Sequence, residues 1–150
     1  MVKILSSFFG IGYTPKMPGT AGAAAAVLLF LLFRYAGILS GSAFLFFTII
    51  LTVFAILVGN LAEAVFGRRD PQIFVLDEVC GMFVTFCYTD TYDLWPVLIL
   101  GFILFRLLDI IKPLMVQSAE RLPGGYGIVM DDIVAGLIAN LILHAFFCIF

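Results

Sequence analysis

Charged side chains are scarce in this sequence. Only 12% of its residues are Asp, Glu, Lys or Arg, whereas soluble domains contain about a quarter. Hydrophobic residues make up 63% of the chain, and the mean hydropathy is +1.19. A soluble protein keeps charged residues on its surface, so a composition this low in charge indicates that most of the surface faces lipid. The Lys and Arg residues form no basic run, which argues against binding of nucleic acid.

The reactive residues of several phosphatase classes are also missing. The only histidine is His144, so a mechanism that needs two histidines is disfavoured. No Arg lies six positions after Cys80, Cys87 or Cys148, as a cysteine-based phosphatase requires, and we expect these cysteines to be apolar packing residues. The DxDx[TV] motif and the long acidic motif of CDP-alcohol transferases are absent. Metal-activated water remains as a hydrolytic mechanism.

Long apolar runs, by contrast, are plentiful, and a bilayer-spanning helix needs about 20 such residues. We expect five spans, at Ala21–Leu39, Ala43–Gly59, Ile73–Thr89, Leu94–Ile111 and Ile133–Phe150. Met1–Gly12 is too short to span and is expected to be an interfacial helix. The predicted fold is an all-α integral membrane bundle of about five transmembrane helices. The chain length of 150 residues suits a single domain, residues 1–150.

Capping and turn residues set the expected boundaries of these spans. Thr20 is a suitable N-cap for the first span. The second span should continue as helix as far as Phe66. Pro123–Gly127, with the sequence PGGYG, should form a flexible turn, after which Asp131 and Asp132 open the last span.

With five spans, most of the charge gathers at one membrane face. The polar residues at these helix ends are Lys16 and Thr20 before the first span, Asp77 and Glu78 at the start of the third, Arg106, Asp109 and Lys112 at the end of the fourth, and Asp131 and Asp132 at the start of the fifth. The basic residues on this side are Lys3, Lys16, Arg68, Arg69, Arg106, Lys112 and Arg121. Only Arg34 leans to the other side, so the positive-inside rule predicts a cytoplasmic N-terminus.

The paired acids at this face admit two interpretations. Asp77–Glu78 and Asp131–Asp132 could simply be favoured by the dipoles at helix starts. Consecutive residues point about 100° apart on a helix, however, so both members of a pair cannot serve one cap. Together with Asp109 they would repel each other unless a cation lies among them, and carboxylates suit Mg²⁺ or Mn²⁺. We therefore predict that these five acids supply metal ligands and the base for an attacking water.

The neighbouring cations are less decisive by themselves. Arg106, Asp109 and Lys112 are spaced i, i+3, i+6 along one helix face. They form either a local ion pair with snorkelling ends or a carboxylate flanked by two phosphate-binding cations, and the spacing leaves both interpretations open. Lys16 and Thr20 are candidate phosphate contacts at a helix start, although their loop alone would be an ordinary entry turn.

Three sequence blocks resemble the phosphatidylglycerophosphatase A family. They are TPKMPGTAG (Thr14–Gly22), VLDEVCGM (Val75–Met82), and FRLLDIIKP (Phe105–Pro113) followed by GGYGIVMDDIVAG (Gly124–Gly136). The resemblance implies a Mg²⁺-dependent phosphatase of the bacterial inner membrane. It would hydrolyse phosphatidylglycerophosphate to phosphatidylglycerol and inorganic phosphate at the cytoplasmic face. The site residues it implies are Asp77, Glu78, Arg106, Asp109, Lys112, Asp131 and Asp132.

Two other functions remain open at this point. An ion-coupled transporter would need polar residues that continue to the opposite face, and the middle of each span is nearly uncharged. A non-catalytic scaffold would use the acids only as helix caps, so Asp109→Asn and Asp132→Asn would lose nothing measurable. Glu63 and Asp70 are expected to be solvated charges beside a loop. The oligomeric state and the number of metal ions are not determined by the sequence.

Overall fold

The computed structural model describes residues 1–38, 40–68 and 70–149, and no strand occurs within these ranges. The helices are α1 (Val2–Ser6), η1 (Ile11–Tyr13), α2 (Pro18–Ala36), α3 (Gly41–Phe66), α4 (Leu76–Thr85), α5 (Leu94–Ile111), α6 (Leu114–Glu120) and α7 (Gly125–Ile149). The predicted all-α class is confirmed. Leu39, Arg69 and Phe150, which the predictions above include, lie outside the described residues.

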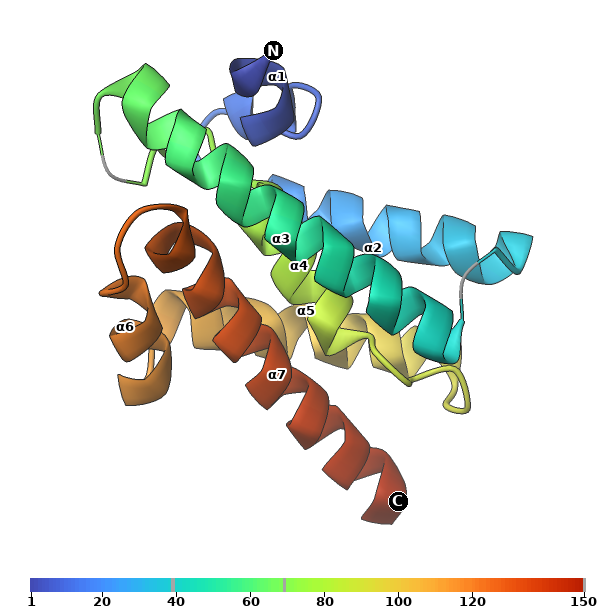
Figure 1. Ribbon diagram of the computed structural model, residues 1–150. Coiled ribbons are helices and arrows are strands. Elements are labelled where there is room, and N and C mark those ends of the chain that lie inside the picture. The colour runs from blue at the N-terminus through green and yellow to red at the C-terminus, as the bar shows by residue number, and fades with distance from the viewer. Residues whose placement is uncertain (39, 69, 150) are drawn as a thin grey trace.

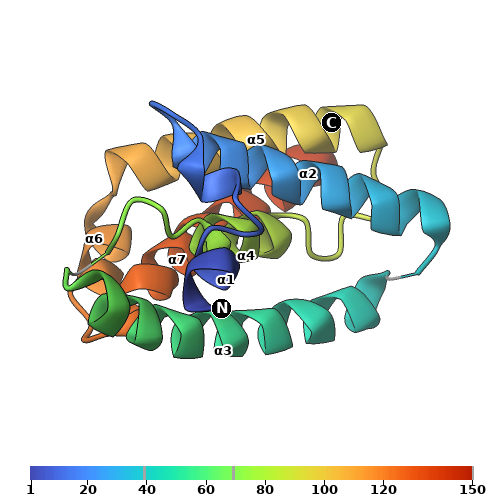
Figure 2. The same ribbon diagram turned by 90° about the horizontal axis from the view of Figure 1, so that it is seen from above.

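Four helices are long and apolar enough to cross a membrane, namely α2, α3, α5 and α7. They contain 19, 26, 18 and 25 residues, so they extend about 27 to 39 Å, and the hydrocarbon core is about 30 Å thick. α2 and α5 run side by side along one flank of the bundle and α3 along the other, with α7 crossing between them (Figures 1 and 2). Four of the expected spans are therefore long helices.

The expected third span, Ile73–Thr89, is much shorter than predicted. Its helix α4 has only 10 residues, or about 15 Å, and all but one of them are buried. α4 lies in the centre of the bundle, between α3 and the α2–α5 pair (Figure 2). The chain still passes from one end of the bundle to the other here. Non-helical backbone is tolerated beside α4 because protein rather than lipid surrounds it.

α2 and α7 both begin earlier than the sequence suggests. α2 starts at Pro18, because proline suits the first position of a helix, so Thr20 lies in the first turn and is not the N-cap. α7 starts at Gly125, whose backbone N–H donates a 2.8 Å hydrogen bond to Oδ1 of Asn60 on α3. This bond satisfies one of the amides left free at a helix start.

Two expected features of α7 are therefore wrong. Three of the five residues of the predicted flexible turn, Gly125–Gly127, belong to the helix. Asp131 and Asp132 do not open α7 but lie about two turns inside it, where both are buried.

α4 and α7 cross at two glycines. A Cβ atom on Gly136 would overlap the backbone carbonyl oxygen of Gly81, so the two backbones are in direct contact. Small residues permit this close approach in membrane helices. Asp77 precedes Gly81 by four residues, and Asp132 precedes Gly136 by the same number. Each acid thus lies one turn from the crossing, on the side where α4 begins.

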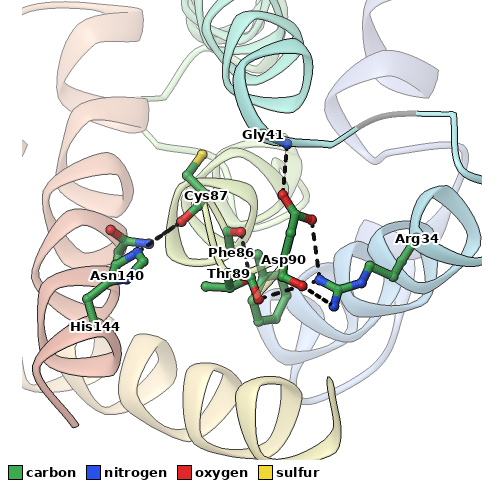
Figure 3. Close-up of polar contacts among 8 residues, drawn as sticks. All are labelled: Arg34, Gly41, Phe86, Cys87, Thr89, Asp90, Asn140 and His144. Atoms are coloured by element: carbon green, nitrogen blue, oxygen red, sulfur yellow. Dashed lines mark hydrogen bonds and ion pairs between the residues drawn. The ribbon is translucent and has the colours of Figure 1, made fainter. Parts of the chain in front are cut away.

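Polar contacts fasten the opposite end of the bundle (Figure 3). Asp90 pairs with Arg34 of α2, at 3.3 Å between Oδ1 and Nη1, and accepts a 2.8 Å hydrogen bond from the backbone N–H of Gly41. Asn140 of α7 donates a 2.9 Å hydrogen bond to the carbonyl of Cys87, just beyond the end of α4. These contacts join α2, α3, α7 and the α4–α5 connection at one level.

The N-terminal segment differs in extent from the predicted helix Met1–Gly12. α1 covers only Val2–Ser6, and Phe8 and Phe9 have φ angles of +44° and +58° that end it. The carbonyl of Ser6 accepts a 2.9 Å hydrogen bond from the backbone N–H of Val75, directly before α4. This contact holds the segment against the bundle end where α4 begins, and its location at a membrane interface stays a prediction.

Candidate active site

A cavity of about 560 Å³ opens at the end of the bundle where α2, α4 and α7 begin and α5 ends. The residues singled out from the sequence all line it: Lys16, Thr20, Asp77, Glu78, Arg106, Asp109, Lys112, Asp131 and Asp132. They come together because the chain passes alternately up and down through the bundle. The cavity therefore brings together acids that could hold a metal ion and cations that could bind a phosphate.

Three of the acids form a close group, which we call the acidic trio: Asp77, Glu78 and Asp132. One carboxylate oxygen from each lies within 4.8 Å of the others. Asp77 and Asp132 are only 7% and 3% exposed. Ionised carboxylates this close repel one another strongly when water is excluded, so a cation among them is favourable. Carboxylate oxygens are also the ligands that Mg²⁺ prefers.

The other two acids are paired with cations. Asp109 pairs with Arg106 three residues earlier on α5. Asp131 accepts a 2.9 Å hydrogen bond from Nζ of Lys112. The five predicted metal ligands therefore divide into the acidic trio and two carboxylates that hold basic side chains in place.

Lys112 connects three elements at the cavity edge. It follows the last residue of α5 with a left-handed backbone (φ +47°), and its Nζ lies 3.0 Å from Oε1 of Glu120 at the end of α6 as well as beside Asp131 of α7. Burial lowers the pKa of Lys112, but its hydrogen bonds to these two carboxylates outweigh burial and raise the pKa above the ordinary value. Lys112 thus stays positively charged at neutral pH.

Three buried polar atoms around the cavity have no hydrogen-bond partner among the described residues. They are Oε2 of Glu78, Oδ1 of Asp131 and Nε of Arg106. Buried polar atoms are nearly always hydrogen-bonded, to protein or to water. Two free acceptors and one free donor in a single cavity fit a bound cation and a bound anion, which the described residues themselves do not supply.

The first turn of α2 packs directly on Glu78 and Arg106. A Cβ atom on Gly19 would overlap Oε1 of Glu78 and lie 3.3 Å from Nη1 of Arg106. The backbone amides at the start of α2 are therefore near the cavity, as an anion site requires. Lys16 lines the cavity from the preceding loop, and none of the ion pairs found in the described ranges includes it.

Comparison with known proteins identifies the family of this chain. The phosphatidylglycerophosphatase A family model matches residues 4–147. The chain belongs to the phosphatidylglycerophosphatase A family. It is 35% identical to phosphatidylglycerophosphatase A of Escherichia coli over 94% of this chain and 80% of that protein, and 29% identical to that of Haemophilus influenzae over 96% and 87%.

A third relative carries a different name. A Bacteroides thetaiotaomicron protein with the provisional name phosphatidylinositol-3-phosphatase is 34% identical over 93% of this chain and 89% of its own length. No solved structure matches the chain. The family resemblance in the sequence is therefore confirmed, and membership of the phosphatidylglycerophosphatase A family makes the protein a membrane phosphatase.

Some residues that line the cavity were not predicted from the sequence. Asp70 and Gln72 line it, whereas Asp70 was expected to be a solvated loop charge. Asp70 is exposed, so it lies at the rim of the cavity, and Glu63 lies outside it. The loop that carries Asp70 has no periodic pattern from which its direction could be predicted. Asn60, which fixes the start of α7, is one of the few polar residues of the apolar helix α3.

Proposed function

We propose that the protein is a Mg²⁺-dependent lipid phosphatase that hydrolyses phosphatidylglycerophosphate to phosphatidylglycerol and inorganic phosphate. The observation that carries the proposal is the acidic trio, with its oxygens within 4.8 Å of one another, in a cavity also lined by three cations. The names of two relatives support the substrate. Carboxylates for a metal and cations for a phosphate in one cavity are the parts that metal-assisted phosphoryl transfer requires.

The acidic trio would hold the Mg²⁺ ion. When bound, Mg²⁺ acts as a Lewis acid toward phosphoryl oxygens and makes a bound water more acidic. Asp131 is the candidate base for the attacking water, because Lys112 occupies its Oδ2 while its Oδ1 has no partner among the described residues. A base must lie within hydrogen-bond reach of the water it activates, and a free buried carboxylate oxygen meets that requirement.

The cations would bind the two phosphates of the substrate. Arg106 suits bidentate contact with the terminal phosphate, and the pairing with Asp109 fixes the direction of its guanidinium group. Lys112 would add a second positive charge beside Asp131. Lys16 and Thr20 lie where α2 meets the cavity, so they would contact the phosphate that links the headgroup to the diacylglycerol.

The two alternative functions have less support. A transport pathway would need polar groups from the cavity to the opposite end, but Met82, Phe83 and Phe86 fill the space between and are at most 1% exposed. A scaffold would keep buried carboxylates without ligands, which is costly. In a scaffold, the buried oxygens Oε2 of Glu78 and Oδ1 of Asp131 would have no ligand to contact.

We place the cavity at the cytoplasmic face of the bacterial inner membrane. Among the described basic residues, Lys16, Arg106 and Lys112 line the cavity, Lys3, Arg68 and Arg121 belong to segments at the same end of the bundle, and Arg34 belongs to the opposite network. By the positive-inside rule the cavity end, and with it the N-terminus, faces the cytoplasm. The relatives named above are bacterial proteins.

The test is phosphate release by the purified protein in detergent. We expect release from phosphatidylglycerophosphate with Mg²⁺, loss of release with a chelator, and recovery when Mg²⁺ is restored. Phosphatidic acid and phosphatidylinositol 3-phosphate are the comparison substrates, the second because of the name of one relative. A folded protein that releases no phosphate from any of the three lipids would contradict the proposal. Faster release from a comparison lipid would contradict only the headgroup assignment.

A further inference from the structure

A second cavity, of about 520 Å³, lies on the lipid-facing side of the bundle between α2 and α5. All its lining side chains are apolar. Leu28 of α2 and Ile99 of α5 are 67% and 57% exposed along it, and Ala24 is its smallest lining side chain. We call this cavity the α2–α5 groove. A groove of this composition fits a hydrocarbon chain and offers nothing to a polar ligand.

The α2–α5 groove continues the polar cavity along the same helix faces. On α5, Ile99, Phe102 and Ile103 line the groove, and Arg106 follows with the spacing i, i+3, i+4, i+7 that defines one face of a helix. Arg106 already lines the polar cavity. The apolar stripe of α5 therefore ends at a phosphate-binding candidate.

The same relation holds on the opposite wall. Ala24, Leu28 and Leu31 of α2 line the groove, and Thr20 precedes Ala24 by one turn on the same face. The first turn of α2 also lies 3.3 Å from Arg106, measured from a Cβ built on Gly19. The two walls thus meet at the polar cavity, and polar residues give way to apolar ones within one turn on both helices.

We propose that the α2–α5 groove binds an acyl chain of the lipid whose phosphate group lies in the polar cavity. This inference rests on the proposed function and adds the site for the substrate's hydrocarbon part. From Arg106 to Trp95 at the far end of the groove, α5 rises about 16 Å. Half of the hydrocarbon core measures about 15 Å, so the groove accommodates the chain of a lipid from one leaflet.

The test uses a variant that fills the groove. Ala24→Phe adds an aromatic ring to an exposed position, where the helix tolerates it, and Val53→Phe is the matched control on the exposed side of α3. The substrates are phosphatidylglycerophosphate with long acyl chains and a water-soluble short-chain analogue with the same headgroup. We expect Ala24→Phe to raise KM for the long-chain lipid about tenfold and to leave the short-chain kinetics unchanged. Val53→Phe should change neither.

Each contrary outcome is informative. Equal effects of Ala24→Phe on both substrates, or no effect on either, would overturn the inference while wild-type activity upholds the proposed function. Wild-type protein that hydrolyses neither substrate would instead contradict the proposed function. A change in oligomeric state caused by Ala24→Phe, with kinetics unchanged, would overturn the inference in favour of an interface between copies of this chain.

Photo-crosslinking gives a readout that does not depend on turnover. A phosphatidylglycerophosphate analogue with a diazirine in one acyl chain should label peptides containing Leu28 and Ile99 in excess over those containing Val53, which is also exposed on a helix of the bundle. Excess unlabelled phosphatidylglycerophosphate should suppress this labelling. Equal labelling of all three positions would mean bulk lipid only and would overturn the inference.

Discussion

Replacement of Asp132 by Asn tests the acidic trio most directly. The trio oxygens lie within 4.8 Å of one another, so each ionised pair costs at least about 3.5 kcal/mol at an effective dielectric constant of 20. Asn keeps the shape of Asp and removes the charge from two of the three pairs, which relieves at least about 7 kcal/mol when all three acids are ionised. Proton binding by the acids reduces this figure but not its sign. Without Mg²⁺, Asp132→Asn should therefore melt no lower than the wild type, although Asp132 is only 3% exposed.

Mg²⁺ should reverse the order of the two Tm values, so that the wild type melts higher than Asp132→Asn. A ligand at 100 times its Kd stabilises the folded state by about 2.7 kcal/mol, which corresponds to about 5 to 10 °C in Tm for a chain of this length. The wild type should show this increase, and Asp132→Asn should lose most of it. Phosphate release by the variant should fall at least about 100-fold, because a missing ligand weakens the Lewis acid on which the proposed reaction depends.

The assay is thermal unfolding in detergent, followed by far-UV circular dichroism at increasing Mg²⁺ concentration. Asp93→Asn is the matched control, since Asp93 is exposed at the opposite end of the bundle and should leave both the Mg²⁺ response and the activity unchanged. A lower Tm for Asp132→Asn without Mg²⁺, together with an intact Mg²⁺ response, would refute the reasoning. Asp132 would then be a structural residue rather than part of a cation site.

Three further substitutions test other parts of the molecule. Lys16→Ala should raise KM for phosphatidylglycerophosphate about tenfold with little change in kcat, and Lys16→Arg should restore it, because a charged hydrogen bond to phosphate is lost and regained; steady-state kinetics check this. Gly136→Ala should lower the free energy of unfolding by about 1 to 3 kcal/mol, because the new methyl group overlaps the carbonyl of Gly81; denaturant titration measures it. Asp90→Ala removes the partly exposed ion pair with Arg34 and should cost about 1 kcal/mol of stability while phosphate release is retained; Tm and activity together decide.

Apolar run length was enough to predict the long helices. α5 has the predicted bounds, Leu94–Ile111, because polar residues and Pro113 limit its apolar run on both sides. The segment Ile73–Thr89 is also mostly apolar, yet its helix has 10 residues. Its burial on all sides by neighbouring helices is a tertiary property, and a short apolar run by itself does not reveal such burial. The sequence therefore indicates that the chain crosses the bundle here, but it does not indicate the length of the helix.

The sequence predicted which residues come together at the candidate site, but not which of them pair with one another. Alternating passes bring helix ends to one level, and this alone gathers the nine residues around one cavity. The pairing of Lys112 with Asp131 joins residues 19 positions apart, and it depends on how α6 turns the chain back toward α7. Helical spacing predicts the Arg106–Asp109 contact but not this one. The separation of the acids into a trio and two ion pairs thus required the tertiary structure.

The short length of α4 explains how the acids come to lie inside the protein. A full-length third span would place Asp77 at the membrane surface, level with the end of α5, where water could solvate it. α4 instead begins within the bundle, and the Gly81–Gly136 crossing sets Asp77 beside Asp132, two turns inside α7. The acids are then too buried to be solvated individually, which favours a shared cation. Under the proposed function the phosphate would enter the cavity, while the α2–α5 groove would keep the acyl chain at the lipid boundary. We therefore expect the lipid to be hydrolysed without leaving the bilayer.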